Sequence, residues 1–424
     1  MSMDKKVPEI RFNDFGEEWN GRCLGSLCLI GDIDHRMPES KTMGIPYLMT
    51  GDFCGINGLD FKNAKLISIE DYELLSKKIK PEYGDILFAR YASVGSVRYV
   101  ETKIDFLISY SCAIIKTNNT SYGKFLFYCF QTDNTQKKIE LDINTGSQRN
   151  IGIDSLKNLF VFLPKSEEQI VIGNYFQKLD SLIIQHQQKH DKLSNIKKSM
   201  LDKMFPKQGK TIPEIRFKGF SGEWEEKPFG DCFVNVPNNT LSRANLNYKT
   251  GLAKNIHYGD VLIKLGEILD ASNEILPFIT NDDVANKLKH ATLRDGDVII
   301  ADAAEDSTVG KCTELFNINE QLVLSGLHTI AVRPTLPFAS KYLGYYLNSS
   351  SYHDQLLSLM QGTKVLSISK TAIQNTNVAF PKSSEEQAAI GNYFQKLDML
   401  INQHQQQITK LNNIKQACLS KMFV

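Results

Sequence analysis

Apolar residues recur at alternating spacings of three and four along two long stretches of the chain. The first stretch covers 167–205 and the second covers 385–423. A period of 3.5 residues, sustained over about four heptads, predicts two long helices that pair as a left-handed coiled coil. A single amphipathic helix lying on a globular body is the alternative interpretation, and the same rhythm in both stretches counts against it.

Polar residues interrupt both apolar seams near their midpoints. Polar groups inside a seam cost stability but fix the register and orientation of the helices. We therefore expect antiparallel packing. The expected opposite pairs are His186 with Gln407, Lys189 with His404, Leu182 with Leu411, and Leu193 with Leu400. The other seam positions that we single out are Leu179, Ile196, Leu397 and Ile414.

The two stretches are copies of one another, because 27 of their 39 positions are identical at an offset of 218 residues. A shorter segment is also duplicated: PEIRFNDFGEEW at Pro8–Trp19 returns as PEIRFKGFSGEW at Pro213–Trp224. The chain is therefore a tandem of two repeats, each with an opening segment, a divergent block and a long helix. The predicted boundaries are 1–20 for the opening segment, 21–163 for the first block, 164–206 for the first helix, 207–224 for the linker and second opening segment, 225–380 for the second block, and 381–424 for the second helix.

Short runs rich in β-branched and aromatic residues predict strands in both blocks. In the first block these runs are 84–90, 96–100, 108–116 and 158–164, and the aromatic run 124–132 suits a helix better. The second block repeats this order at 295–302, 308–315, 324–334, 340–350 and 361–381. The expected fold is α/β (α+β): two mixed blocks separated by an antiparallel two-helix coiled coil, with pseudo-twofold symmetry.

The predicted helices would each be roughly 50–58 Å long, at a rise of 1.5 Å per residue. Antiparallel packing would place the blocks at opposite ends of the coiled coil, because each helix follows its own block. Such spacing would suit a DNA site whose halves lie a helical turn or more apart, since one turn is about 34–36 Å.

Composition narrows the class of protein without pointing to nucleic acid. The formal net charge is +1, so any contact with DNA must come from local cations. The sequence starts without the apolar run of a signal peptide, and no stretch of about 18 apolar residues predicts a membrane span. Eight scattered cysteines without a CxxC pair argue against zinc and disulfides. These features together predict a cytoplasmic protein.

The motifs of the relevant enzymes are missing from the sequence. A methyltransferase needs a Gly-rich loop and an Asn/Asp-Pro-Pro-aromatic motif, but there is no GxG and no Asn-Pro or Asp-Pro dipeptide. GxxxxGK[ST], HExxH and GxSxG are also missing. Acid-rich stretches at 282–283 and 302–306 could suggest a nuclease metal site, but exposed loops explain them better. We expect neither a catalytic residue nor a metal site.

Taken in order, these features resemble the specificity (S) subunit of type I restriction–modification systems. The resemblance rests on the PEIRF…W opening, the GDILF…VG segment, and the runs TGSQRNIGIDSLKNLFVFLPKSEEQ and GTKVLSISKTAIQNTNVAFPKSSEEQ that lead into the helices. It extends over almost the whole chain.

The resemblance implies that each block is a target recognition domain that reads one half of a bipartite site in double-stranded DNA. The coiled coil would be the spacer and would dock two methyltransferase (M) subunits, which bind S-adenosylmethionine. Restriction (R) subunits that hydrolyse ATP with Mg²⁺ would join them. The chain itself would bind no cofactor and would be a non-catalytic subunit in DNA methylation and restriction.

Base edges are read by Arg, Lys, Asn, Gln, Ser or Thr on loops that reach a groove. In the first block the candidates for base contacts are Arg90, Tyr91, Ser93, Gln148, Arg149 and Asn150, and those for phosphate contacts are Arg98 and Lys116. In the second block the candidates are Lys311, Lys364, Ser367 and Lys370. Asp302 stands at the place of Arg90, so either the second reading differs there or this loop does not touch bases. A surface salt bridge is the competing explanation for any one arginine.

Two other functions compete with this hypothesis. A coiled-coil scaffold that binds proteins and not DNA would fit the weak net charge, and sequence-selective DNA binding in complex with a methyltransferase would distinguish the two. A fragment of a fused nuclease–methyltransferase is the third, against which the missing cofactor motifs count.

Overall fold

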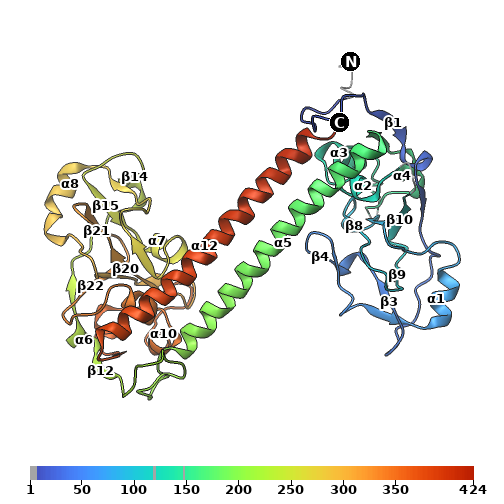
Figure 1. Cartoon of the computed structure of the whole chain (residues 1–424). Helices are drawn as coiled ribbons and strands as arrows, with labels where there is room; N and C mark the ends of the chain where they lie inside the picture. Colours follow the sequence, from blue (N-terminus) through green and yellow to red (C-terminus); the bar gives the residue numbers. More distant parts are fainter. Residues whose placement is uncertain (1–6, 118–120, 147–148) are drawn as a thin grey trace. The chain divides into compact units, whose positions relative to one another are not determined.

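The computed structural model describes residues 7–117, 121–146 and 149–424 (Figure 1). Its contacts divide the chain into two compact units. Unit 1 contains residues 1–187 and 405–424, and unit 2 contains residues 188–404. Each unit therefore combines one opening segment and one block with parts of both long helices. No helix in the described part of the chain is long and apolar enough to cross a membrane.

Unit 1 is built around a four-stranded antiparallel sheet of order β2-β10-β7-β8, beside a smaller sheet of order β6-β3-β9. Strand β1 pairs with β11, and β4 pairs with β5. The strands are β1 (Asn20–Cys23), β2 (Leu29–Gly31), β3 (Ile45–Leu48), β4 (Phe53–Cys54), β5 (Gly58–Leu59), β6 (Lys65–Ile67), β7 (Ile86–Ala89), β8 (Val97–Tyr99), β9 (Leu107–Ile108), β10 (Cys112–Lys116) and β11 (Phe160–Leu163). The helices are η1 (Leu24–Ser26), η2 (Thr50–Asp52), α1 (Ile69–Leu75), α2 (Gly123–Cys129), α3 (Asp133–Leu141), α4 (Ile153–Asn158) and the first part of α5 (Ser166–Lys203).

Unit 2 is built around a five-stranded sheet of order β13-β22-β18-β20-β16, beside a sheet of order β14-β17-β15-β21. Strand β12 pairs with β24, and β19 pairs with β23. The strands are β12 (Glu225–Pro228), β13 (Phe233–Val236), β14 (Leu246–Asn247), β15 (Ala253–Ile256), β16 (Ile268–Asp270), β17 (Phe278–Ile279), β18 (Val298–Ala301), β19 (Ala303–Ala304), β20 (Cys312–Phe316), β21 (Leu322–Ser325), β22 (Thr329–Pro334), β23 (Leu366–Ser367) and β24 (Asn377–Phe380). The helices are the second part of α5, α6 (Phe229–Cys232), η3 (Arg243–Asn245), α7 (Tyr258–Ile263), α8 (Asp282–Lys287), η4 (Lys289–Ala291), α9 (Tyr342–Leu347), α10 (Ser350–Leu357), α11 (Lys370–Gln374) and the first part of α12 (Ser384–Lys421).

The central sheets of the two units are copies of one scaffold. Strands β13, β22, β18 and β20 take the places of β2, β10, β7 and β8, and unit 2 adds β16, which is parallel to β20. The same ion pair lies at the start of the central strand in both sheets. Asp85 is 2.8 Å from Lys116 in unit 1, and Asp297 is 2.7 Å from Arg333 in unit 2. The predicted repetition of one mixed α/β block is confirmed.

The central strands are buried on both faces, which explains why their sequences are continuously apolar. In β7, Ile86 and Phe88 face the core that contains α2, whereas Leu87 faces the core that contains β3. In β18, Val298 and Ile299 divide between two cores in the same way. The cores therefore lie on both sides of each central sheet, and its ends are left for loops.

The strand predicted over 108–116 is wrong in one respect, because the structure breaks it. A turn separates β9 from β10, and in this turn the Cys112 N–H donates to Ser109 O (2.8 Å). The equivalent run in unit 2 breaks into β21 and β22, with His328 near the turn in the left-handed region (φ 52°). Both flanking strands are buried, so the apolar pattern continues across the turn and hides the break.

In each unit, the beginning of one long helix packs against the end of the other. Within unit 1, Lys415 Nζ of α12 lies 2.7 Å from Asp180 Oδ1 of α5. Within unit 2, Lys197 Nζ of α5 lies 2.6 Å from Asp398 Oδ1 of α12. The antiparallel pairing of the two helices is therefore confirmed.

The register of this pairing also agrees with the sequence. Tyr175 Oη lies 3.5 Å from Cys418 Sγ, and moving one heptad along both helices from this contact places Leu182 opposite Leu411. Of the twelve seam residues named above, eleven are buried or half-buried, whereas Lys189 is exposed, so its predicted place in the seam opposite His404 is wrong. The polar seam residues His186 and His404 are half-buried like their apolar neighbours.

Each duplicated opening segment is hydrogen-bonded both to the end of one long helix and to the start of the other. In unit 1 the Ile10 N–H donates to Lys421 O at the end of α12 (2.9 Å). The next residue, Arg11, makes two 2.7 Å hydrogen bonds to Glu168 near the start of α5. The equivalent residues of unit 2 are Ile215 with Lys203 (2.9 Å) and Arg216 with Glu386 (both bonds 2.7 Å). The repeated PEIRF motif thus has a structural role.

An aromatic residue just beyond the end of each long helix completes the core of a unit. Phe423 packs against Trp19, Phe125 and Phe176, with ring centroids 6.2, 5.2 and 5.7 Å apart. The equivalent contacts of unit 2 join Phe205 to Trp224, Tyr342 and Phe394, at 6.3, 6.2 and 5.9 Å. The core of each block is therefore completed by an aromatic residue from the other repeat of the sequence: Phe423 for the first block and Phe205 for the second.

Replacing Phe423 with Ala should destabilise unit 1 by about 3–5 kcal/mol, because it empties a buried aromatic site. Hydrogen exchange followed by mass spectrometry would then show faster exchange in β7 and β10 but not in β18 and β22. Ser420→Ala, at an exposed position on the same last turn, is the matched control and should change neither unit. Equal acceleration in both units would contradict the assignment of Phe423 to one core.

Candidate nucleic-acid interface

Two loops occupy equivalent positions in the two units and contain most of the exposed candidates. Reciprocal backbone hydrogen bonds between Asn144 and Asn150 close the 144–150 loop, at 2.8 and 3.3 Å. The same bonds between Gln361 and Ser367 close the 361–367 loop, at 2.9 and 2.8 Å. The two ends of each loop are therefore held together by the same pair of backbone bonds.

Each loop is fixed to the residue that follows the central strand. The Ile151 N–H donates to Arg90 O (3.1 Å) in unit 1, and the Ile368 N–H donates to Asp302 O (2.9 Å) in unit 2. The structure thus brings together two candidate segments that lie far apart in the sequence of each block. We call this meeting point the junction.

Three predicted residues of the first block surround its junction. Tyr91 forms a β-bridge with Asn150, and its ring centroid lies 5.6 Å from the Arg90 guanidinium carbon. Ser93 is exposed on the turn that follows, where its carbonyl accepts from the Ser96 N–H (3.0 Å). Gln148, another candidate on the 144–150 loop, lies outside the described residues.

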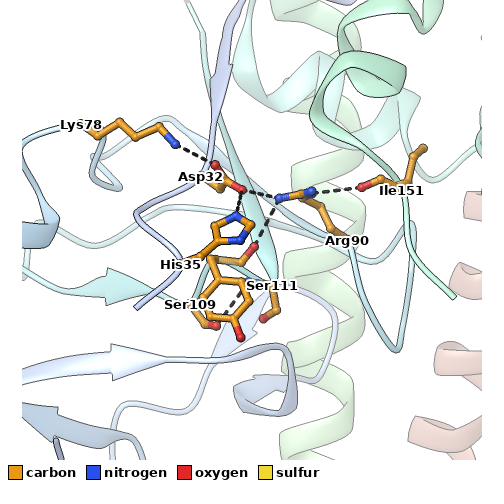
Figure 2. A network of polar contacts seen from close by, with 8 residues as sticks. Asp32, His35, Lys78, Arg90, Ser109, Ser111 and Ile151 are labelled. Carbon is orange, nitrogen blue, oxygen red and sulfur yellow. Dashed lines mark hydrogen bonds and ion pairs between the residues drawn. The ribbon is translucent and has the colours of Figure 1, made fainter. Parts of the chain in front are cut away.

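Arg90 is buried and ties the junction together (Figure 2). The residue is 6 % exposed, and its guanidinium pairs with Asp32 and donates to Ile151 O (3.0 Å) and Tyr110 O (3.4 Å). A guanidinium with these buried partners is not available to a guanine base. We therefore correct the prediction for Arg90: it is a positioning residue that holds the 144–150 loop, and it is not placed to contact a base.

Asp32 is a buried carboxylate shared by two cationic side chains, Arg90 and Lys78, and by a histidine, His35. Besides Arg90, it accepts from Lys78 Nζ and from His35 Nε2, both at 3.0 Å. Burial alone would raise the pKa of Asp32, but these partners outweigh burial and hold the pKa below its usual range. Because removing one partner of a buried ion pair is strongly destabilising, the network fixes Arg90 in its place.

Neither predicted phosphate contact of the first block is placed for that role. Arg98 donates to Gly58 O (3.1 Å) and Gly55 O (3.2 Å), and burial lowers its pKa. Lys116 lies between two carboxylates, 2.7 Å from Glu82 and 2.8 Å from Asp85. Both side chains stabilise the fold, so we correct these two predictions as well.

Arg149 remains as the exposed cation of the 144–150 loop. Its side chain is 55 % exposed and pairs with the exposed Glu140. Exposed ion pairs of this kind contribute only about 0–1 kcal/mol, so a phosphate or a base could take the place of Glu140 at little cost. Arg149 therefore keeps an exposed guanidinium, and its role as a base contact stays a prediction.

The candidates of the second block also divide into exposed residues and a residue that packs within the unit. Lys364, Ser367 and Lys370 are exposed, and Lys370 Nζ lies 3.3 Å from Asn238 Oδ1. Lys311 is half-buried and donates to Leu262 O (2.9 Å), and burial lowers its pKa. We therefore correct the prediction for Lys311, which packs inside unit 2, whereas the 361–367 loop and the start of α11 keep their exposed polar side chains.

The acid-rich stretch at 302–306 serves local structure. Asp302 Oδ1 lies 3.1 Å from His328 Nδ1, and Asp306 accepts from the Thr308 N–H (2.9 Å). In the ranges that the structure describes, no group of three His, Cys, Asp or Glu side chains is arranged to hold a metal ion.

Residues 16–195 and 223–413 match the sequence family described as the type I restriction modification DNA specificity domain. The chain belongs to this family. Two solved structures are similar to it. The S subunit of a type I restriction–modification system from M. genitalium is 16% identical, with a TM-score of 0.58 and 99% of both chains covered. A chain from work on complex assembly and conformational transition of the type I R-M system is also 16% identical, with a TM-score of 0.50, covering 95% of this chain and 96% of that chain. At this identity the likeness shows the fold alone.

The two DNA specificity domains share a scaffold but differ at the junction. Arg90 in the first domain is replaced by Asp302 in the second, and each has a different set of partners. Sequence reasoning missed two histidines here, His35 and His328, because an isolated histidine in a loop gives no signal. The run DIDHR around His35 was the only hint, since it places acids beside the histidine.

Replacing Arg90 with Ala should destabilise unit 1 by about 3 kcal/mol, because it leaves Asp32 with fewer cations and Ile151 O without its donor. Arg149→Ala removes only an exposed ion pair and should change stability by less than about 0.5 kcal/mol. Chemical denaturation of the two variants measures the difference. Similar losses of stability in both variants would show that Arg90 is not a buried positioning residue.

Proposed function

We propose that this chain is the non-catalytic DNA-specificity subunit of a type I restriction–modification complex, in which each specificity domain reads one half of a bipartite site. The observation that carries the proposal is the pair of equivalent loops, 144–150 and 361–367, which occupy the same place on one scaffold but differ in sequence. Recognition of two different half-site sequences requires a shared scaffold that positions the loop and loop side chains that differ between the domains.

The exposed side chains of these loops have the chemistry that DNA requires. Arg149 suits bidentate contact with guanine, and Lys364 and Lys370 suit guanine or phosphate oxygens. Ser367 can donate or accept. Because basic and acidic side chains balance to a net charge of +1, contact with DNA would depend on local cations such as these.

We further propose that the coiled coil sets the spacing of the two half-sites and docks the methyltransferase subunits. The catalytic steps, and the S-adenosylmethionine, ATP and Mg²⁺ that they need, would belong to the methyltransferase and restriction subunits. Support for docking comes from residues that the two helices share and that remain exposed in both. Many of the identical positions, such as Glu168, Gly173, Phe176 and Asp180, already contact their own unit.

A second set of identical positions is exposed in both helices, and we call it the repeated polar face. Its members are Asn174, Lys178, Gln185, Gln188, Lys192 and Asn195 in α5, and Asn392, Lys396, Gln403, Gln406, Lys410 and Asn413 in α12. The exposed positions on a neighbouring face differ between the helices: Ile184, Asp191 and Lys198 in α5 correspond to Asn402, Thr409 and Gln416 in α12. Identical exposed residues fit two copies of one partner, which must meet the same surface twice.

Replacing Arg149 with Ala should impair methylation at one half-site while leaving the other half unchanged, because base contacts specify sequence. Lys364→Ala should impair the opposite half. Methylation of DNA substrates with single-base changes in each half, by the chain co-purified with its methyltransferase subunits, measures both effects. Equal loss on all DNA would make these residues phosphate contacts. A wild-type complex that shows no sequence-selective binding would reject the specificity subunit and favour a protein scaffold.

Replacing Lys178, Lys192, Lys396 and Lys410 together with Glu should weaken methyltransferase docking roughly tenfold or more, because it reverses the charge of the repeated polar face. Lys198→Glu changes an exposed lysine of the neighbouring face and is the matched control. Affinity would be measured by titrating purified methyltransferase subunits onto the immobilised chain. If the fourfold variant bound them as tightly as the control does, this face would not be the dock.

A further inference from the structure

An exposed histidine stands at the junction of the first specificity domain, held by a carboxylate and an aromatic ring. His35 Nε2 lies 3.0 Å from Asp32 Oδ2, in the network that also holds Arg90 (Figure 2). The His35 ring stacks on Tyr110, with centroids 4.7 Å apart and planes at 20°. Its side chain is nevertheless 60 % exposed. The imidazole is thus fixed in orientation while remaining open to solvent.

The second domain holds an exposed histidine in the same manner. His328 Nδ1 lies 3.1 Å from Asp302 Oδ1, and its ring meets the edge of Tyr258 with centroids 5.3 Å apart. Its side chain is 52 % exposed. His328 also has a left-handed backbone (φ 52°), a conformation that costs free energy for a residue other than glycine.

These two histidines reach one place in the fold from different positions of the chain. In unit 1, the Arg90 N–H donates to Ser111 O (2.9 Å); in unit 2, the Asp302 N–H donates to His328 O (3.1 Å). His328 is therefore the counterpart of Ser111, whereas His35 follows β2. A histidine, an aspartate and a tyrosine thus meet in both domains through residues that are not copies of one another, although the first ring is stacked on its tyrosine and the second meets its tyrosine at 77°.

Packing of the core does not explain this arrangement. An exposed side chain gains little from an ion pair or a stack, and ordering it costs conformational entropy. A histidine whose one ring nitrogen faces a carboxylate has its proton on that nitrogen in the neutral form. The other nitrogen, Nδ1 of His35 or Nε2 of His328, is then a fixed hydrogen-bond acceptor. Such an acceptor suits the exocyclic amino group of adenine or cytosine in the major groove.

We propose that His35 and His328 are specificity-determining residues, each of which accepts a hydrogen bond from a base amino group beside the loop of its domain. The proposal rests on the function proposed above. The carboxylates Asp32 and Asp302 orient the rings, and the neighbouring tyrosines prevent them from turning. Arg149 and Lys364 are exposed donors near the two junctions, so each domain would combine a donor with an acceptor at the junction.

The decisive variant is His35→Phe, which keeps a ring to stack on Tyr110 but has no nitrogen to accept. Asp32 keeps Lys78 and Arg90 in this variant, so unit 1 should fold normally, and a thermal melt checks this. The complex with the methyltransferase subunits is assayed on substrates that carry each base at each position of both half-sites. Discrimination should fall about tenfold to a hundredfold at one adenine or cytosine of one half-site only.

The reciprocal variant is His328→Asn, because asparagine tolerates the left-handed backbone while its shorter side chain does not reach as far. It should relax one position of the opposite half-site. His290→Phe is the matched control, since His290 is an exposed histidine of unit 2 that bonds only to the Lys287 carbonyl. It should leave both half-sites unchanged.

Three outcomes would overturn the proposal. Unchanged discrimination in His35→Phe and His328→Asn would remove the histidines from the reading, and a uniform loss on all DNA that varies with salt would make them phosphate contacts. Relaxation at a guanine or thymine would show that they donate instead. Failure of the proposed function is distinct from all three, because the wild-type complex would then show no sequence preference for a variant to lose.

Discussion

The structure depends on an aromatic residue at the end of each long helix that has to be buried. Phe423 fills a site lined by Trp19, Phe125 and Phe176, and this site belongs to the first half of the sequence. The end of α12 is therefore held inside unit 1, where Ile10 and Arg11 fasten it to the start of α5. Antiparallel pairing of the helices follows from this closure as much as from the coiled-coil seam. The cross-helix ion pair of Asp180 with Lys415 fixes the register, because a buried charge tolerates no slippage away from its partner.

This closure changes the meaning of the sequence identity between the two helices. Identical residues at first suggest one partner surface presented twice, but many of them are used inside the units. Gly173 is needed because a Cβ there would lie 2.9–3.0 Å from Tyr122 and Phe125, and Gln169 accepts from the Tyr122 N–H (2.9 Å). Most of the repeated polar face is identical without such a contact among the described residues, and the exception is Asn174, which accepts from the Tyr122 hydroxyl (3.1 Å). Evidence for a partner surface therefore comes from that subset and not from the helices as a whole.

Periodicity and repetition were sufficient to predict the architecture, because both report burial. The seam, the repeats and the strands β7 and β18 follow from patterns that a few neighbouring residues complete. The polar site could not be predicted in this way. Arg90 and Lys116 look like surface cations, and only the folded chain shows that Asp32 and Asp85 lie beside them. An ion pair between residues far apart in sequence leaves no local pattern, so the sequence identifies where loops meet but not which of their cations are free.

The corrected role of Arg90 bears on how two domains with one scaffold would read different bases under the proposed function. In the first domain the junction is held by a buried arginine and its aspartate, whereas in the second an aspartate stands in the place of that arginine and pairs with a histidine. The charge at the centre of the junction is thus reversed, and the residues that support each loop have changed together with the residues that the loop exposes. A side chain such as Arg149 is oriented by this support. Specificity in such a domain is therefore a property of the loop together with its buried support, and the divergence of the two blocks has to reach into the protein interior.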